Sequence, residues 1–344
     1  MKYSKLGLLL SCVIFSAASV AAPVQVSSFG NLPADREVNG FHGSFLYSDT
    51  GTVSGFDLPI LGYSEMDQLN GFQLGLISGS HIRNGMNGAA FGLFNWHGGY
   101  DQGVNFSLAN QVNDIDGVNL GIYSGATGTV HGVSLGAVTT SGNMYGLNVG
   151  AIANYTTGRV KGLNIAPFNW TGQKTDGVNV SVLNHTGDVK GVNIGALGNW
   201  SEGNITGVNL GIVNVSGDVT GLNFAPINKS GNVVGANISA LNWSGDVTGF
   251  NFGAVNIANN VQGMNLGVVN VSNDVNGLNF GVINTTMKTS GTDIGIINYA
   301  GATNFQFGLV NVAEDLEGLQ IGVVNVAMNA AVPVLPIANF HMTF

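Results

Sequence analysis

Aspartate recurs at one turn of a short repeat, and a row of carboxylates is a possible calcium site. The recurring positions are Asp218, Asp246 and Asp274. Calcium takes about six to eight oxygen ligands, yet the intervening copies carry Asn232 and Asn260 instead. The dense Asp- and Gly-rich nonapeptide pattern of calcium-binding solenoids is also absent. The sequence therefore predicts that these aspartates make turns, with no metal site and no cofactor.

The histidines form no recognisable catalytic or metal-binding pattern. They are His42, His81, His97, His131, His185 and His341. No two share a spacing typical of zinc ligands, and spacing alone suggests no Ser-His-Asp arrangement. Solenoids that cleave polysaccharides need clustered Asp, Lys or Arg on one face, whereas the basic residues here are few and scattered. We therefore expect a protein that is not an enzyme.

Aromatic residues fall late in several repeats. They are Trp96, Tyr155, Trp170, Trp200 and Trp243. A stacked aromatic strip could bind sugar rings, but side chains of this kind also fill or cover the corners of a core. The sequence favours the packing role.

Asparagine recurs twice in every regular repeat and is the most regular polar feature of the chain. If identical positions stack about 4.8 Å apart, side-chain amides hydrogen-bond along the stack. We expect two such structural ladders. The first consists of Asn209, Asn223, Asn237, Asn251, Asn265 and Asn279, and the second of Asn214, Asn228, Asn242, Asn256, Asn270 and Asn284.

The repeat that carries these residues is fourteen residues long between Gly207 and Gly277. In the copy GVNLGIVNVSGDVT, apolar residues alternate with Asn or small residues, which is the pattern of a strand. The alternation then changes phase between Leu210 and Val213, so a straight strand would place these two on opposite faces. A bend at Gly211, supported by Pro226 in the next copy, would turn both apolar sets inward. We expect the apolar residues to form a shared narrow interior, to which Val219 and its equivalents also contribute.

Two all-β architectures fit a period of this length. In the first, each repeat is one coil of a parallel β-solenoid. In the second, each repeat is one strand and one turn of an antiparallel outer-membrane barrel. The phase change and the prolines favour the solenoid, whereas the terminal Phe344 after alternating apolar residues resembles a barrel assembly signal.

The chain divides into four segments. Residues 1–22 resemble a secretory signal, with Lys2 and Lys5 before an apolar stretch and small residues before Pro23. Residues 23–54 are predicted to form an N-terminal cap, residues 55–328 the repeat domain, and residues 329–344 a C-terminal strand or cap. The only cysteine, Cys12, lies in the signal, so no disulfide is expected after cleavage.

Composition narrows the possible partners. Only 8% of residues are charged, and the formal net charge is −9. An acidic surface repels the nucleic-acid backbone, so no nucleic-acid partner is expected. The repeat words GMNLGVVNVS (263–272), FGLVNVAED (307–315) and GLQIGVVNVA (318–327) resemble those of a family of bacterial surface-repeat proteins of Gram-negative and spirochaete origin. The resemblance covers most of the chain after Gly55 and implies export and a cell-envelope location, without catalytic residues.

These observations favour a non-enzymatic protein of the cell surface or outer membrane, exported for display, adhesion or recognition of an unidentified protein or glycan. The alternative is an outer-membrane barrel, with a pore as its candidate role. A weaker idea, that the Asn ladders bind ice or a crystalline polymer, lacks the regular Thr rows that would strengthen it.

Overall fold

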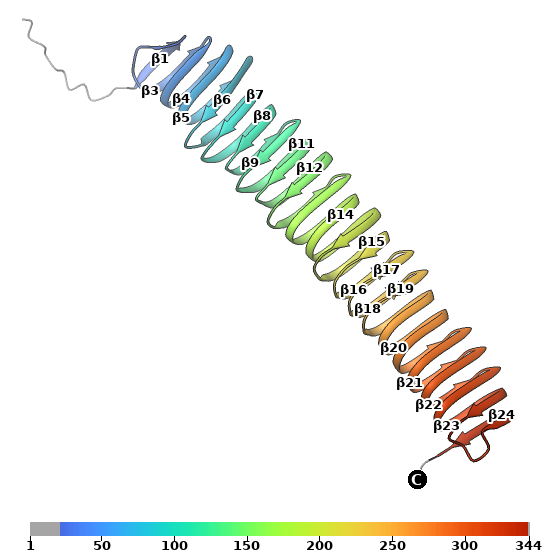
Figure 1. The fold of residues 1–344 in the computed structure, drawn as a ribbon. Helices are drawn as coiled ribbons and strands as arrows, with labels where there is room; N and C mark the ends of the chain where they lie inside the picture. The colour runs from blue at the N-terminus through green and yellow to red at the C-terminus, as the bar shows by residue number, and fades with distance from the viewer. Residues whose placement is uncertain (1–20, 343–344) are drawn as a thin grey trace, which may run out of the picture. The chain divides into compact units, whose positions relative to one another are not determined.

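The computed structural model describes residues 21–342. The chain divides into two compact units, Met1–Gly99 and Tyr100–Phe344, and each is described here over the residues that fall within 21–342. Each unit is a stack of β-coils (Figure 1). The predicted signal peptide lies almost wholly outside the described residues, and so does Phe344. Within residues 21–342, no helix is long and apolar enough to cross a bilayer.

Both units consist of strands. The strands of the first unit are β1 (Ala22–Ser27), β2 (Asn31–Leu32), β3 (Glu37–Ser44), β4 (Tyr47–Pro59), β5 (Leu61–Leu74), β6 (Ile77–Ile82) and β7 (Met86–His97). The second begins with β8 (Tyr100–Val112), β9 (Asp114–Leu120), β10 (Tyr123–Ala126), β11 (Thr129–Ser141), β12 (Asn143–Thr156), β13 (Val160–Ile165), β14 (Phe168–Ser201) and β15 (Ile205–Val215). It continues with β16 (Val219–Phe224), β17 (Ile227–Lys229), β18 (Val233–Ile238), β19 (Leu241–Trp243), β20 (Val247–Phe280), β21 (Ile283–Ile294), β22 (Ile297–Phe307), β23 (Val310–Ala327) and β24 (Val334–His341).

Successive repeats pair in parallel and in register. Residue Gly207 of β15 lies beside Gly221 of β16, and Asn214 lies beside Asn228 of β17. The same one-repeat offset links β16 to β18 and β17 to β19. The parallel β-solenoid prediction is therefore confirmed, with about 20 coils over the two units. The antiparallel barrel alternative is wrong, because neighbouring repeats run in the same direction.

One regular coil has two strands and two connecting edges. In the coil that starts at Val219, the strand β16 is followed by Ala225 and Pro226, then β17, then a turn at Ser230–Asn232. The predicted bend is present at Ala225, which is 2% exposed. Space at the bend is limited, because a Cβ added at the equivalent Gly211 would lie 2.7 Å from Oδ1 of Asn214; the largest residue at this position in the regular coils, Ser239, donates to Oδ1 of Asn242.

The orientation of the alternating residues is the reverse of the prediction. Asn223 and Asn228 are fully buried, whereas Phe224 and Ile227 are 49% and 43% exposed. The expectation that these apolar sets face the interior is therefore wrong. The narrow space between the two strands of a coil accepts Asn and small residues, and strand alternation then directs the bulkier apolar neighbours outward.

A valine row is the apolar part of the interior. Val219, Val233, Val247, Val261 and Val275 are at most 1% exposed and pack into one cluster, as predicted for these positions. They lie beside the turn, whereas the Asn rows lie nearer the Ala225 edge. The interior of the second unit is thus part aliphatic and part amide.

Each repeat opens with glycine for a steric reason that the sequence did not reveal. Gly221 has φ of +129°, in a region open essentially to glycine alone. A Cβ there would lie 2.1 Å from the carbonyl oxygen of Gly207 in the preceding coil. Each such glycine therefore lets its backbone approach the coil below.

The two ends of the chain differ from the regular coils. In the first unit, β1 already pairs in parallel with β3, and Gly40 lies beside Gly55, so coil stacking includes much of the segment before Gly55. At the other end, β24 pairs antiparallel with β23. The final strand therefore covers the edge of the last coil.

Candidate functional site

The first Asn row forms a hydrogen-bonded stack with one break. Nδ2 of Asn209 donates to Oδ1 of Asn223 at 3.2 Å, and Asn223 donates to Asn237 at 3.3 Å. The bonding resumes from Asn251 to Asn265 and from there to Asn279. Between Asn237 and Asn251 the facing Nδ2 and Oδ1 atoms have no partner.

The second Asn row is continuous and also bonds to the backbone. Each Nδ2 donates to Oδ1 of the next member, at distances from 2.9 to 3.3 Å between Asn214 and Asn284. Nδ2 of Asn242 also donates to the carbonyl of Phe252 at 2.9 Å. That carbonyl also accepts the backbone N–H of Ser239 at 2.9 Å, so the amide is its second donor and ties the side chain to the backbone at the bend. The buried rows are thus structural, and neither offers a face to a ligand.

The turn aspartates have the same kind of role. Oδ1 of Asp218 accepts the backbone N–H of Asn232 at 2.7 Å, and Oδ1 of Asn232 accepts the N–H of Asp246 at 2.9 Å. Asp and Asn therefore alternate as acceptors for the next turn. Among residues 21–342, no three His, Cys, Asp or Glu side chains are grouped so as to hold a metal ion.

A buried Ser-His-Asp contact in the first unit was not evident from sequence spacing. Nε2 of His42 lies 3.2 Å from Oγ of Ser27, and Nδ1 lies 2.5 Å from Oδ1 of Asp57. All three side chains are fully buried. In β3 and β4, His42 and Asp57 occupy successive positions of one inward row. The signal that could have found them is their shared offset from the repeat glycines Gly40 and Gly55.

The arrangement of this trio differs from that of a catalytic relay. A nucleophilic serine gives its proton to the imidazole, whereas Oγ of Ser27 donates to Oδ1 of Asn31 at 2.7 Å. The second oxygen of Asp57 accepts from Nε2 of Gln73 at 2.6 Å. The trio therefore satisfies the polar interior of the first unit, as the Asn rows do in the second.

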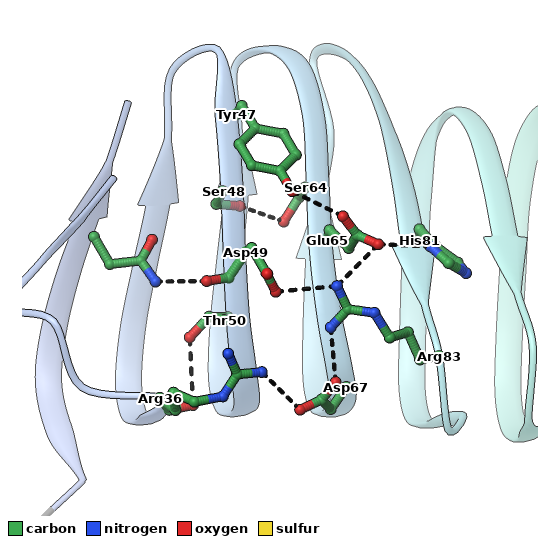
Figure 2. A network of polar contacts seen from close by, with 11 residues as sticks. Arg36, Tyr47, Ser48, Asp49, Thr50, Ser64, Glu65, Asp67, His81 and Arg83 are labelled. Carbon is green, nitrogen blue, oxygen red and sulfur yellow. Dashed lines mark hydrogen bonds and ion pairs between the residues drawn. The ribbon is translucent and has the colours of Figure 1, made fainter. Parts of the chain in front are cut away.

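A network of ion pairs lies on the surface of the first unit (Figure 2). Arg83 contacts three carboxylates, at 3.1 Å to Asp49, 2.9 Å to Glu65 and 2.7 Å to Asp67. Arg36 approaches Asp67 to 3.0 Å. These residues come from β4, β5 and the coils on either side, so the network joins successive coils.

The network shifts the ionisation of its members. Hydrogen bonds from Arg83 and Arg36 lower the pKa of Asp67. Desolvation acts to raise the pKa of Glu65, but hydrogen bonds from Tyr47, Arg83 and other neighbours outweigh it, so this pKa is lowered. The bond to Glu65 in turn raises the pKa of Tyr47. All these groups stay in their ordinary charge states near neutral pH, and their role is to hold coils together.

An apolar groove lies on the surface of the second unit. It has a volume of about 580 Å³ and lies along β12, β14 and β15. One wall is a row of aromatic rings, one per coil, and the other is the row of apolar residues that follows each bend. The aromatic wall consists of Tyr155, Trp170, His185 and Trp200, and the other of Ala153, Phe168, Leu183, Leu197 and Val213.

The rings of the groove stack on one another along the unit. The centroids of Trp170 and His185 are 3.9 Å apart and the rings are nearly parallel, at 6°. Tyr155 and Trp170 are 6.1 Å apart and tilted by 31°. Trp200 is 57% exposed and Trp243, further along the same row, is 56% exposed. These side chains point outward from their strands, so the prediction that they fill the core is wrong, whereas the prediction that they cover its corners stays untested.

A second apolar surface follows the bends of the second unit. We define the apolar edge as the outward residue of each bend from Gly207 onward, together with its neighbours in the two strands. The bend residues are Ile212, Pro226, Ala240, Ala254, Val268, Val282, Ile296, Leu309 and Val323. The strand neighbours, such as Phe224, Phe252 and Phe280, are about half exposed.

In comparisons with known proteins, no family model, no curated protein and no solved structure matches the chain. The resemblance to bacterial surface-repeat proteins therefore stays a prediction.

Proposed function

We propose that this chain is a non-enzymatic repeat protein, exported to the cell envelope, that recognises a protein partner through the groove between Tyr155 and Trp200. The observation that supports recognition is the groove itself. It is a long, exposed and almost wholly apolar depression. The polar side chains described above, in contrast, bond to one another and hold the coils together. Binding sites are typically concave and lined by apolar and aromatic side chains.

The stacking of the rings favours a polypeptide over a glycan. Sugar recognition uses open aromatic faces, but one face of Trp170 lies against His185. The groove instead presents ring edges on one side and aliphatic groups on the other. A polypeptide segment with several apolar side chains suits such a slot, because both of its walls are hydrophobic.

The export part of the proposal is supported by the N-terminal sequence. Lys2 and Lys5 precede an apolar stretch and small residues, which is the pattern of a secretory signal. Labelling of intact producing cells with a membrane-impermeant amine reagent tests surface exposure. Labelling only after the cells are lysed would contradict it.

The groove is tested by retention of purified protein on cell envelopes that are isolated from the producing bacterium and stripped of lipid with detergent, so that only protein and glycan partners remain. A variant with Trp170→Ala and Trp200→Ala removes two rings of the wall, and we expect at least about tenfold weaker retention, since large aromatic anchors dominate interfaces. Trp243→Ala is the matched control, because Trp243 is equally exposed in the same row but lies outside the groove.

Pretreatment of the envelopes distinguishes the partner classes. Digestion with a protease should abolish retention of the wild-type protein. If digestion with glycosidases abolishes it instead, the partner is a glycan. Equal retention of the wild-type protein and the double variant would show that the groove is not the recognition site.

A further inference from the structure

The apolar edge of the second unit is continuous and free of charge. From Ile212 to Val323, the outward side chains at and beside each bend are aliphatic or aromatic. Val268, Leu309 and Val323 are 51%, 54% and 64% exposed. At about 4.8 Å per coil, this edge extends for roughly 40 Å. Contiguous apolar surface of this extent marks a site of interaction with a protein or a membrane.

Charge is concentrated on the opposite edge of the same coils. The turns and the first residues of each following strand carry the acidic Asp218, Asp246, Asp274, Glu314, Asp315 and Glu317 and the basic Lys288. Between residues 207 and 325, the charged residues outside these turns are Lys229 in the outer row of β17 and Asp293, which is buried. Each coil is therefore amphipathic across its width, with one edge suited to water and the other to hydrocarbon.

The variation along the apolar edge favours a fluid partner. Pro226, Ala240, Val268 and Leu309 occupy equivalent bends and differ in size and shape while remaining apolar. A protein interface needs matched shapes and about one hydrogen bond per 100–200 Å². The bend positions offer no side-chain donor or acceptor, and lipid chains require none.

Two aromatic residues lie beside the apolar edge, on the side of the second strand. Trp243 and Tyr299 lie in the outer row of the second strand, two positions beyond Leu241 and Ile297. Their rings are 56% and 38% exposed. Trp and Tyr are enriched at the level of lipid headgroups. A unit resting on its apolar edge would place these rings at that level.

From these observations we infer that the second unit binds a lipid surface, lying along the bilayer with its apolar edge inserted among the upper acyl chains. Binding depends on hydrocarbon contact and not on charge, since the chain is acidic and the edge is neutral. It therefore occurs on zwitterionic lipid and persists in high salt. The apolar edge meets the recognition groove at Val213 and extends away from it toward Val323, and the inference holds whether or not the groove has a partner.

The test is flotation of the purified protein with phosphatidylcholine vesicles in about 0.1 M and about 1 M NaCl, between which the Debye length falls from roughly 10 Å to roughly 3 Å. The edge variant carries Val268→Asp and Leu309→Asp, and we expect it to bind at least about tenfold more weakly, because carboxylates oppose insertion. The control carries Val234→Asp and Asn276→Asp, which lie on the opposite edge of the coils, just after the turns. Val234 is 52% exposed, like Val268, and the added charge is the same.

Wild-type and control protein should float with the vesicles at both salt concentrations, and the edge variant should not. A second variant, Val268→Thr with Leu309→Thr, adds no charge and should bind vesicles with intermediate strength. It replaces the Asp variant in the test if that variant does not fold. Failure of the wild-type protein to float would overturn the inference, as would equal flotation of all variants. If the wild-type protein instead forms dimers without vesicles and the edge variant does not, the edge binds a second copy and the lipid assignment is wrong.

Discussion

Asparagine decides which side of each strand is buried. Its amide carries both donors and an acceptor, so one side chain can bond to the coil below, the coil above and the backbone at the bend. Asn242 does all three. An aliphatic side chain in the same place would leave the buried Oδ1 of Asn256 without this donor, and unsatisfied buried groups are costly.

We predict that Asn242→Ala lowers the free energy of unfolding of the second unit by about 2–4 kcal/mol, because several buried partners lose their bonds at about 1–3 kcal/mol each. Urea unfolding followed by circular dichroism measures the change. Asn276→Ala is the control, since Asn276 is exposed, and its effect should stay within about 0.5 kcal/mol. Equal effects of the two substitutions would contradict the structural role of the row.

Asp293 occupies an inward position at which preceding coils have Asn279 and Asn265. Burial raises the pKa of Asp293, although hydrogen bonds from Asn279 and Thr289 partly oppose it. With a folded-state pKa above the unfolded value, ionisation favours the unfolded chain as pH rises between the two values, and the penalty then stays constant.

Asp293→Asn should therefore raise the melting temperature at pH 8, and the gain should shrink as pH falls toward about 4, the ordinary pKa of Asp. Melting curves of both proteins between these pH values provide the measurement. A gain that is the same at every pH would show that the carboxylate does not titrate with folding.

The coil is the element that the sequence repeats. Its two strands enclose a narrow interior, and Gly221 permits close approach to the coil below. Coils of the first unit are joined by other contacts, namely the buried contact of His42 with Asp57 and the partly exposed network around Arg83. These polar contacts stand where the regular Asn rows do not extend.

We predict that Arg83→Met destabilises the first unit by about 1–2 kcal/mol at pH 7, since three partly exposed ion pairs are lost at about 0.2–1 kcal/mol each. The pKa values of Glu65 and Asp67 are lowered in the folded state, so their contribution is present above about pH 4 and is lost as pH falls through the folded pKa values. Hydrogen exchange of the β4 and β5 amides at pH 7 and in acid measures both effects. Arg159→Met is the control, because Arg159 is exposed in the second unit. If Arg83→Met destabilised the first unit equally in strong acid, the ion pairs would not be the source of its effect.

At the scale of the molecule, the two units differ in what they bury and what they expose. The first has mixed polar rows and an ion network, and the second has regular Asn rows with an apolar edge opposite its charged turns. Each coil contacts mainly its neighbours, so stability in such a stack is approximately a sum of local terms.

This predicts that Asn242→Ala increases amide exchange chiefly in the coils between Asn228 and Asn256. The coils between Gly103 and Asn154 should keep their protection, because no direct contact reaches them. Exchange followed by mass spectrometry resolves the two regions. A uniform loss of protection over the second unit would instead show that it opens as one cooperative body.

The fourteen-residue period, the phase change between Leu210 and Val213 and the small residue at Gly211 were enough to predict parallel coils with a bend, because each reflects a local backbone requirement. Only the tertiary structure decided which of two alternating sets is buried. Alternation places Asn223 and Phe224 on opposite faces of a strand, but it does not say which face meets the other strand of the coil. The width of that space and the bonds that Asn makes across and along it settle the choice, and they bring together residues fourteen positions apart. The same selection of the inward-facing set explains two further features. It buries the contact of Ser27, His42 and Asp57, and it leaves the groove at Trp170 exposed.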